Sequence, residues 1–145
     1  MRHRRATRKF NRTASHRLRM LQHLSEGLFR SYAIVTTVTK AKEARPFAEQ
    51  LITLARRGTP QDQREARRTI HDKMAYQTLF LKLGPHFKDR QGGYTRILRM
   101  ARRPGDGAEV ALWELVGRED LGHPPGKPVV KAEKQGTEKE RAGTR

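Results

Sequence analysis

The chain has no cysteine among its 145 residues. This absence excludes disulfide bridges, thiolate zinc sites and cysteine nucleophiles, and it fits a protein that works in a reducing cytoplasm. Aromatic side chains are also scarce, at 6% of the chain, and hydrophobic residues of all kinds reach only 34%. A chain of this length and composition has room for one domain with a small core.

Long apolar runs and acidic residues are lacking as well. No run approaches the roughly 18 to 20 residues that a membrane-spanning helix needs, and no signal-peptide core follows the N-terminal arginines. Only 15 Asp and Glu oppose 32 Lys and Arg, which gives a formal net charge of +17. Because such charge repels itself in a compact free monomer, we expect a polyanionic partner. Nucleic acid is the first candidate, and an anionic membrane surface is a weaker second.

Motifs for catalysis and cofactor binding are missing. The glycines at 92–93 and 105–107 lack the spacing of nucleotide-binding phosphate loops. His16 and His23 are not followed by a second pair of ligands, so no metal site is expected. Ser15 and His16 point apart on a helix and cannot act as a nucleophile and its base. We therefore expect no enzyme activity, no cofactor and no small-molecule substrate.

Composition divides the chain into three parts. Residues 1–13 form a basic N-terminal arm, and the first 19 residues hold eight Arg and Lys without one acid. Such a segment cannot fold alone and should be mobile until phosphates neutralise it. Residues 14–117 are predicted to form a single globular domain. Residues 118–145 have seven basic and five acidic residues and little to bury, which predicts a disordered C-terminal tail.

The first half of the folded part predicts two helices around a short strand. Apolar residues recur at helical spacing up to Tyr32, after a cap at Thr13 or Ser15. Residues 34–38 are mostly β-branched and indicate a strand. A second helix follows, with Thr39 as a possible cap.

That second helix is predicted to stop at Gly58, which suits a left-handed C-cap. Pro46 lies within it and implies either a kink or a helix that starts there. The next four residues, Thr59-Pro60-Gln61-Asp62, have the form of a capping box with proline at the first helical position. They open a polar third helix that buries little beyond Ala66 and Ile70.

A fourth helix and a hairpin complete the prediction. Asp72 can cap the fourth helix, and Gly84-Pro85 is expected to end it. Residues 94–100 and 110–116 read as two strands joined by a turn that contains Pro-Gly-Asp-Gly. The order α-β-α-α-α-β-β predicts an α+β fold with helices packed on a small mixed sheet.

The arginine-rich arm has the clearest chemistry for binding. A guanidinium group grips phosphate with two hydrogen bonds and stacks on bases. Lys40, Lys42 and Arg45 lie on a predicted helix with few acids, and the high net charge favours RNA contact over a merely solvated face. The stretch Gly92-Gly93-Tyr94-Thr95-Arg96 could bring its backbone, Tyr94 and Arg96 to RNA, but an ordinary loop leading into a strand explains it equally well.

Several segments are similar, in order and spacing, to one known family. They are Met-Arg-His at the start, KFNR at 9–12, SHR at 15–17, TTVTKAKE at 36–43, LITLA at 51–55, GGYTRIL at 92–98 and GDGAEVALWELV at 105–116. Together they resemble the bacterial large-subunit ribosomal protein L-seventeen family over residues 1–117. Residues from Arg118 onward lie beyond the usual family end and inherit nothing from it.

The resemblance implies an α+β fold of the same element order and binding to large-subunit ribosomal RNA. It also implies neighbouring large-subunit proteins as partners, and a cytoplasmic place on the solvent side of the large subunit, near the mouth of the peptide exit tunnel. The candidate RNA-binding residues lie in the arm, on the first two helices and along the strand and turn at 94–103. They are Arg2, His3, Arg4, Arg5, Arg8, Lys9, Asn11, Arg12, His16, Arg17, Lys40, Lys42, Arg45, Tyr94, Arg96, Arg99, Arg102 and Arg103.

Two other classes of protein remain as alternatives. A small basic DNA-binding protein would use the helices predicted at 60–71 and 73–83 as a helix-turn-helix, but the second offers mostly apolar groups plus Lys73 and Lys82. A small RNA-cleaving enzyme would need a paired acid and base, which the sequence does not offer. The nucleic acid that copurifies with the protein would separate these classes. The sequence leaves both a bacterial and a mitochondrial origin open, although the Met-Arg-His start shows no presequence-like amphipathic leader.

Overall fold

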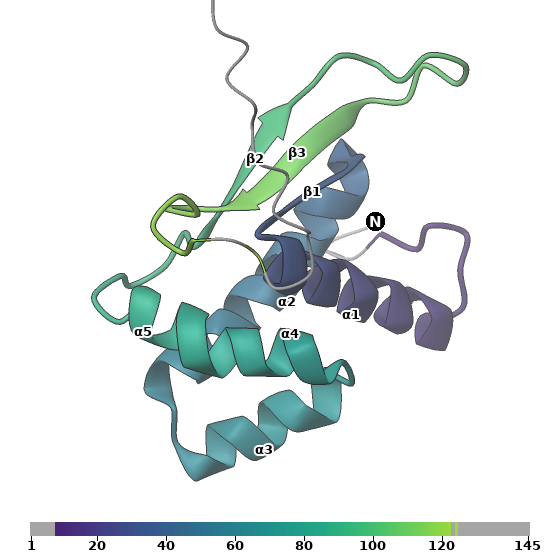
Figure 1. The fold of residues 1–145 in the computed structure, drawn as a ribbon. Coiled ribbons are helices and arrows are strands. Elements are labelled where there is room, and N and C mark those ends of the chain that lie inside the picture. The colour runs from purple at the N-terminus through teal and green to yellow at the C-terminus, as the bar shows by residue number, and fades with distance from the viewer. Residues whose placement is uncertain (1–7, 123, 125–145) are drawn as a thin grey trace, which may run out of the picture.

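The computed structural model describes residues 8–122 and 124. Helices α1 and α2 lie between a three-stranded sheet on one side and α3 with α4 on the other (Figure 1). The elements in chain order are α1 (Ala14–Ser31), β1 (Ala33–Thr37), α2 (Val38–Arg57), α3 (Pro60–Thr69), α4 (Lys73–Thr78), the π-helical segment η1 (Leu79–Leu83), α5 (Gly84–His86), β2 (Thr95–Arg99) and β3 (Val110–Leu115). The predicted α+β class and the predicted element order are confirmed.

The sheet has the order β1-β3-β2, and both of its strand pairs are antiparallel. The expectation of a mixed sheet is therefore wrong. β3 folds back along β2 as a hairpin and also inserts beside β1, so the parallel strands β1 and β2 never pair. Trp113 on β3 lies in register with Ile34 on β1 and Ile97 on β2.

The two faces of the sheet differ in burial. Ala111, Trp113 and Leu115 alternate along β3 and are fully buried against the helices. On the opposite face, Val35 and Leu98 flank Leu112 in one cross-strand row and stay 61% and 43% exposed. The sheet is thus covered by helices on one side only.

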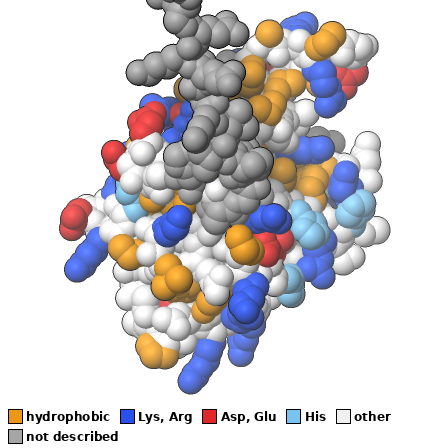
Figure 2. Space-filling view, viewed as in Figure 1, with side chains coloured by type: hydrophobic (Ala, Val, Ile, Leu, Met, Phe, Trp, Pro, Cys, Tyr) orange, Lys and Arg blue, Asp and Glu red, His pale blue; other side chains and the backbone are white. Residues whose placement is uncertain are grey.

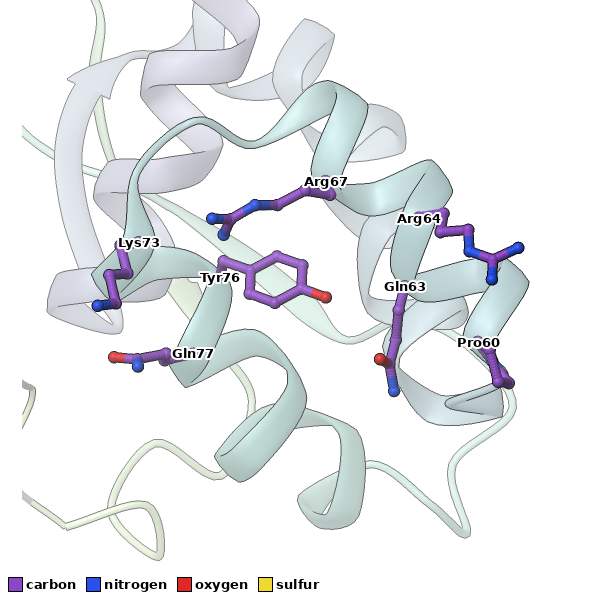
Figure 3. Close-up of a pocket in the computed structure, with 7 residues that line it drawn as sticks. All are labelled: Pro60, Gln63, Arg64, Arg67, Lys73, Tyr76 and Gln77. Carbon is purple, nitrogen blue, oxygen red and sulfur yellow. The ribbon is translucent and has the colours of Figure 1, made fainter.

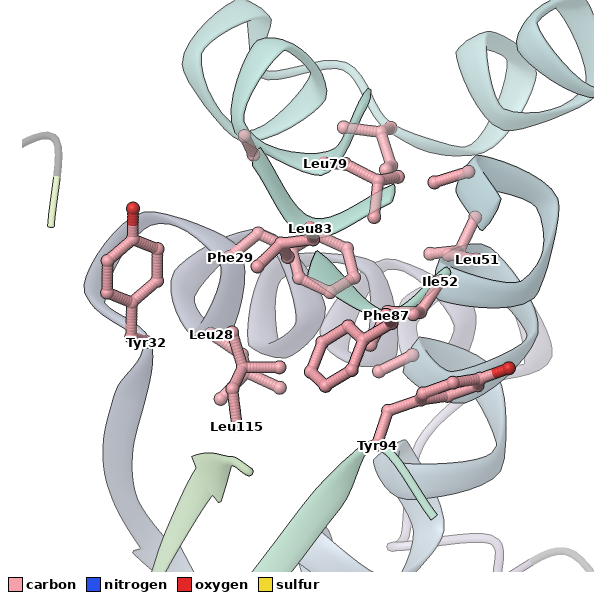
Figure 4. Packing of buried hydrophobic residues seen from close by; sticks show 14 of the residues in the cluster. Leu28, Phe29, Tyr32, Leu51, Ile52, Leu79, Leu83, Phe87, Tyr94 and Leu115 are labelled. Carbon is pink, nitrogen blue, oxygen red and sulfur yellow. The ribbon is translucent and has the colours of Figure 1, made fainter. Parts of the chain in front are cut away.

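The core lies between the sheet and the helices, as Figure 4 shows. α1 contributes Phe29, α2 contributes Ile52, and the turns after α4 contribute Leu79 and Leu83, all of them fully or almost fully buried. Leu115 closes this cluster from the sheet side. Burial of such side chains is the main stabilising term for so small a domain.

The two ends of α2 and the start of α3 lie at residues 37–38 and 58–60. Thr37, in extended conformation, precedes α2, so the expected cap at Thr39 is wrong: Val38 already starts the helix. Pro46 lies inside α2, which starts well before it, and Gly58 ends α2 in the left-handed conformation, as predicted. The predicted cap at Thr59 is confirmed, because its Oγ1 accepts a hydrogen bond from the Asp62 N–H at 3.2 Å. The return bond of a full capping box is replaced, because the Asp62 carboxylate accepts from the Thr59 hydroxyl at 2.7 Å.

The helical backbone does not end at Gly84-Pro85 as expected. Asp72 caps α4 as predicted, but the chain then continues through η1 into α5. The N–H of Gly84 donates to the carbonyl of Leu79, five residues back, which widens the turn. Pro85 then sits in the first turn of α5, where a helix needs no N–H from it.

The C-terminal end of the described region also corrects an expectation. Residues 118–121 form turns, and Leu121 packs against the core, although they were predicted to begin a disordered tail. Arg118 makes a 3.2 Å ion pair with Glu114 of β3, which holds this segment to the sheet. The predicted arm residues 1–7 and the tail residues 123 and 125–145 lie outside the described residues.

Candidate nucleic-acid interface

The described end of the arm folds against α2. The backbone N–H of Arg8 donates to Glu43 Oε1 at 3.2 Å. A turn follows in which the Arg12 N–H donates to the carbonyl of Lys9 at 3.1 Å, and Asn11 takes a positive φ of 50°. This turn directs the arm into the start of α1.

Several of the predicted RNA-binding residues meet at this junction. Arg12 Nη1 lies 2.6 Å from His16 Nε2, one turn into α1, and Arg17 follows on the same helix. Arg8, Lys9 and His16 are exposed there. The remaining predicted arm residues, Arg2, His3, Arg4 and Arg5, lie outside the described residues.

The cations predicted on α2 do not form one patch. Lys42 and Arg45 are exposed, but Lys40 is half-buried and lies on a different side of the helix. Arg45 Nε donates to Glu49 Oε1 at 3.0 Å, so this guanidinium already has an anionic partner. Within the described part of the chain, Lys40 and Lys42 form no ion pair with a carboxylate.

Two of the predicted RNA-binding residues, Tyr94 just before β2 and Arg96 on β2, already make contacts within the fold. Tyr94 is 2% exposed, and its ring packs on Phe87 with centroids 5.1 Å apart. The stacking of a base on Tyr94 is therefore a wrong expectation, because the ring already belongs to the core. Arg96 Nη2 lies 2.9 Å from Glu114 Oε1, in a carboxylate that Arg118 also binds.

The loop between β2 and β3 is tied together by Arg103 and Asp106. Arg103 Nε donates to Asp106 Oδ1 at 3.0 Å, and Arg103 Nη2 binds Asp106 Oδ2. This arginine, helped by the N–H of Ala108, lowers the pKa of Asp106 to about 2, and the carboxylate in turn raises the pKa of Arg103. Arg99 and Arg102 have no carboxylate partner in the part of the chain that the structure describes.

A group of cations on α3 and α4 is not among the RNA-binding residues predicted from the sequence. Arg64, Arg67 and Arg68 are exposed on α3, and Lys73 begins α4. The Arg67 guanidinium lies 4.8 Å from the centroid of the Tyr76 ring. The signal was present, since the polar third helix carries three arginines and one nearby glutamate, but its pairing with Tyr76 depends on how the two helices pack.

The described surface as a whole is rich in cations that no acid neutralises. Carboxylates pair with Arg30, Arg45, Arg96, Arg103 and Arg118. The other described arginines and lysines make no such pair, and basic side chains recur across the face seen in Figure 2 with fewer acidic ones between them. Such a surface, on a small α+β domain, is typical of the class of basic proteins that bind polyanions.

The described residues give no support for a metal site or for a membrane-spanning helix. Among the described residues, no cluster of three His, Asp or Glu is placed to hold a metal ion. None of the described helices has both the length and the apolar character needed to cross a bilayer.

Comparisons with known proteins place the chain in a family. The family model for "Ribosomal protein L17" matches residues 20–116. A large ribosomal subunit protein bL17 from Gemmatimonas aurantiaca is 51% identical over 80% of this chain and 98% of its own length. The bL17 protein of Salinibacter ruber is 49% identical over 83% of this chain and 61% of its own length. The bL17 protein of Anaeromyxobacter dehalogenans is 48% identical over 81% of this chain and 73% of its own length.

This small basic α+β protein is therefore a ribosomal protein. The chain belongs to the ribosomal protein L17 family. This confirms the family resemblance seen in the sequence motifs. The relatives found are ribosomal proteins, so the comparisons lend no support to the DNA-binding alternative.

Proposed function

We propose that this chain is a structural constituent of the large ribosomal subunit that binds and stabilises large-subunit ribosomal RNA. The observation that supports this most is a surface of cations without carboxylate partners on a member of a ribosomal protein family. Each cation that meets a phosphate releases a condensed counterion, which drives binding without any chemical step. The proposed role is structural rather than catalytic.

The binding surface that we propose has three described parts. The first is the junction of the arm with α1, where Arg12 and His16 lie together beside Lys9. Lys40 and Lys42 on α2 form the second. The third is the loop between β2 and β3, which projects beyond the sheet in Figure 1. Arg99 lies at the end of β2, and Arg102 lies in this loop. Arg96 and Arg103 act in the fold instead, by holding Glu114 and Asp106.

The arm is proposed to order on RNA and to supply most of the affinity. Because residues 9–12 form a turn beside α2, the seven residues before Arg8 set the reach of the arm, which is up to about 25 Å when they are extended and is enough to enter a crevice between RNA helices. Deletion of residues 2–12 should leave the melting temperature nearly unchanged and lower RNA affinity by orders of magnitude. A nearly silent deletion, with a large loss on neutralising Lys40, Lys42 and Arg45, would assign the binding to α2.

The assignment of position rests on the family. The site near the mouth of the peptide exit tunnel, the neighbouring large-subunit proteins and the cytoplasmic location all follow from the resemblance. The division into an arm (1–13), a globular RNA-binding domain from residue 14 and a C-terminal extension belongs to the same proposal, with Leu121 as the last core contact.

Sedimentation of the full chain tests this function. An affinity-tagged copy expressed in a bacterium should migrate with large subunits in a sucrose gradient, and large-subunit ribosomal RNA should copurify with it. Migration at the top of the gradient, or copurification of DNA in place of this RNA, would contradict the proposal.

A further inference from the structure

A cleft of about 610 Å³ lies between α3 and α4. Figure 3 shows that Arg67 from α3 and Tyr76 from α4 point toward each other, whereas Arg64 points outward on the α3 side and Lys73 and Gln77 point outward on the α4 side. Gln63 and Pro60 of α3 complete the lining. The volume falls within the range of roughly 300–1,000 Å³ that is usual for small-ligand sites. The cleft is open on one side, so a ligand that belongs to a larger molecule can enter it.

The charge of the cleft has one sign. Arg64, Arg67 and Lys73 line it, and no acidic residue does. Across the described part of the chain, none of these three cations is within ion-pair distance of a carboxylate. Asp62, the buried acid of α3, binds Thr59 at the helix cap instead. The cleft therefore attracts an anion.

A planar aromatic platform lies beside these charges. The Tyr76 ring is half-buried and packs on Phe80 with ring centroids 4.9 Å apart. The Arg67 guanidinium lies over the Tyr76 ring, 4.8 Å from its centroid, so it covers that face and adds a second planar group to the platform. Aromatic rings and guanidinium planes are the surfaces on which proteins stack unpaired bases.

The two glutamines add hydrogen-bonding groups of both kinds. The side-chain amides of Gln63 and Gln77 offer donors and acceptors at the cleft. An acidic peptide would use the cations but would leave the ring and the amides without a matched partner. A nucleotide matches all three features, through its phosphate, its base face and its base edge.

We propose that the cleft between α3 and α4 binds an unpaired nucleotide of RNA. The base stacks on the Arg67 guanidinium, which lies over the Tyr76 ring, and Gln63 bonds to the base edge. Arg64 and Lys73, on opposite sides of the cleft, attract the phosphates on either side of this nucleotide. This inference rests on the proposed RNA-binding function and adds a site to it that the arm, α2 and the β2–β3 loop do not include.

A pair of charge-matched variants tests the site in the full chain. Arg64→Gln/Lys73→Gln removes two cations from the cleft, whereas Arg57→Gln/Arg68→Gln removes two exposed cations that do not line it. Affinity is measured for a short single-stranded RNA of mixed sequence. The cleft variant should lose roughly tenfold or more affinity beyond the control. Equal losses in the two variants, with wild-type binding intact, would overturn the inference and leave the proposed function standing.

Crosslinking locates the base independently of affinity. A single-stranded RNA containing 4-thiouridine is irradiated with the wild-type protein, which is then digested with trypsin. The crosslinked peptide should be 74–82, which contains Tyr76. Tyr76→Leu should abolish this crosslink and Tyr76→Phe should retain it, with the melting temperature of each variant recorded as the folding control. A crosslink found only in other peptides would overturn the inference.

Two further results would also decide against it. If the cleft variant lost binding to a poly-glutamate peptide and kept its affinity for the single-stranded RNA, the cleft would be a protein-docking site. If the wild-type chain bound no RNA at all, the proposed function would fail together with this site.

Discussion

The carboxylate of Glu26 on α1 accepts a hydrogen bond of 2.9 Å from the backbone N–H of His71, 45 positions later in the chain. The same oxygen accepts the N–H of Asp72 at 3.3 Å, and Arg30 lies 3.5 Å from the Asp72 carboxylate. Glu26 is 7% exposed, so its charge is taken out of water and satisfied by amides just ahead of α4. This contact fixes the start of α4, and with it one wall of the α3–α4 cleft, against α1.

Replacing Glu26 should therefore weaken the fold. Glu26→Ala leaves two partly buried N–H groups without an acceptor, and it should lower the free energy of unfolding by about 1.5–3 kcal/mol. Urea denaturation followed by circular dichroism measures the change. Glu65→Ala, on the exposed side of α3, is the matched control and should stay within about 0.5 kcal/mol of wild type. Equal stability of the two variants would contradict the role assigned to Glu26.

Gly84 lies where the fold leaves no room for a side chain. A Cβ there would lie 2.7 Å from the carbonyl oxygen of Ala55 on α2. Gly84→Ala should destabilise the protein by about 1–3 kcal/mol through this clash, although alanine is the better helix former. In Gly27→Ala the new Cβ meets Ile34 Cγ2 at an ordinary 3.9 Å, so this control should stabilise by about 0.5–1 kcal/mol. The two melting temperatures should move in opposite directions; a rise in both would rule out the close approach.

Trp113 is expected to be the largest single contributor on β3. The side chain is fully buried. Trp113→Ala should cost about 3–5 kcal/mol, because it removes a large apolar group and leaves a cavity. Leu98→Ala, on the uncovered face of β2, should cost far less. A melting temperature unchanged by Trp113→Ala would mean that the ring is not in the core.

Asp106 should show a depressed pKa of about 2 in the folded protein. Because the folded-state pKa lies below the unfolded value, the ion pair with Arg103 stabilises the loop above about pH 4 and is lost as the pH falls towards 2. The carboxyl carbon shift of Asp106 in an NMR titration measures this directly. In Arg103→Gln the midpoint should move back up towards the ordinary value for aspartate. A midpoint near 4 in the wild-type protein would mean that the pair does not form in solution.

Local signals in the sequence predicted the N-terminal caps of α3 and α4 correctly. Asp72 and the Thr59–Asp62 box act within one turn of their own helices, so residue type and spacing suffice to find them. Tyr32 carried no such signal. It ends α1 in the left-handed conformation with a φ of 60°, which is unusual for a residue other than glycine. Its carbonyl accepts the N–H of Leu115 at 2.9 Å, a tertiary contact that no local pattern contains.

Several predictions failed because they depend on how separate elements pack against one another. Gly84 reads as a helix stop in isolation, but its closeness to α2 and the π-helical turn before it keep the backbone helical. Tyr94 reads as a stacking residue, but Phe87 draws its ring into the core. Likewise, the α3–α4 cleft exists only because Arg67 and Tyr76 meet across two helices. Charge composition predicted the kind of partner, whereas packing decides which cations can meet it.

The salt dependence of RNA affinity tests the central claim most directly. The dissociation constant of the full chain for a large-subunit ribosomal RNA fragment is measured by filter binding across a series of potassium chloride concentrations. If five or more phosphates are neutralised, at about −0.7 to −0.9 per contact, the logarithm of the association constant should fall against the logarithm of salt with a slope of about −4 or steeper. A slope near zero would contradict binding by cations and phosphates.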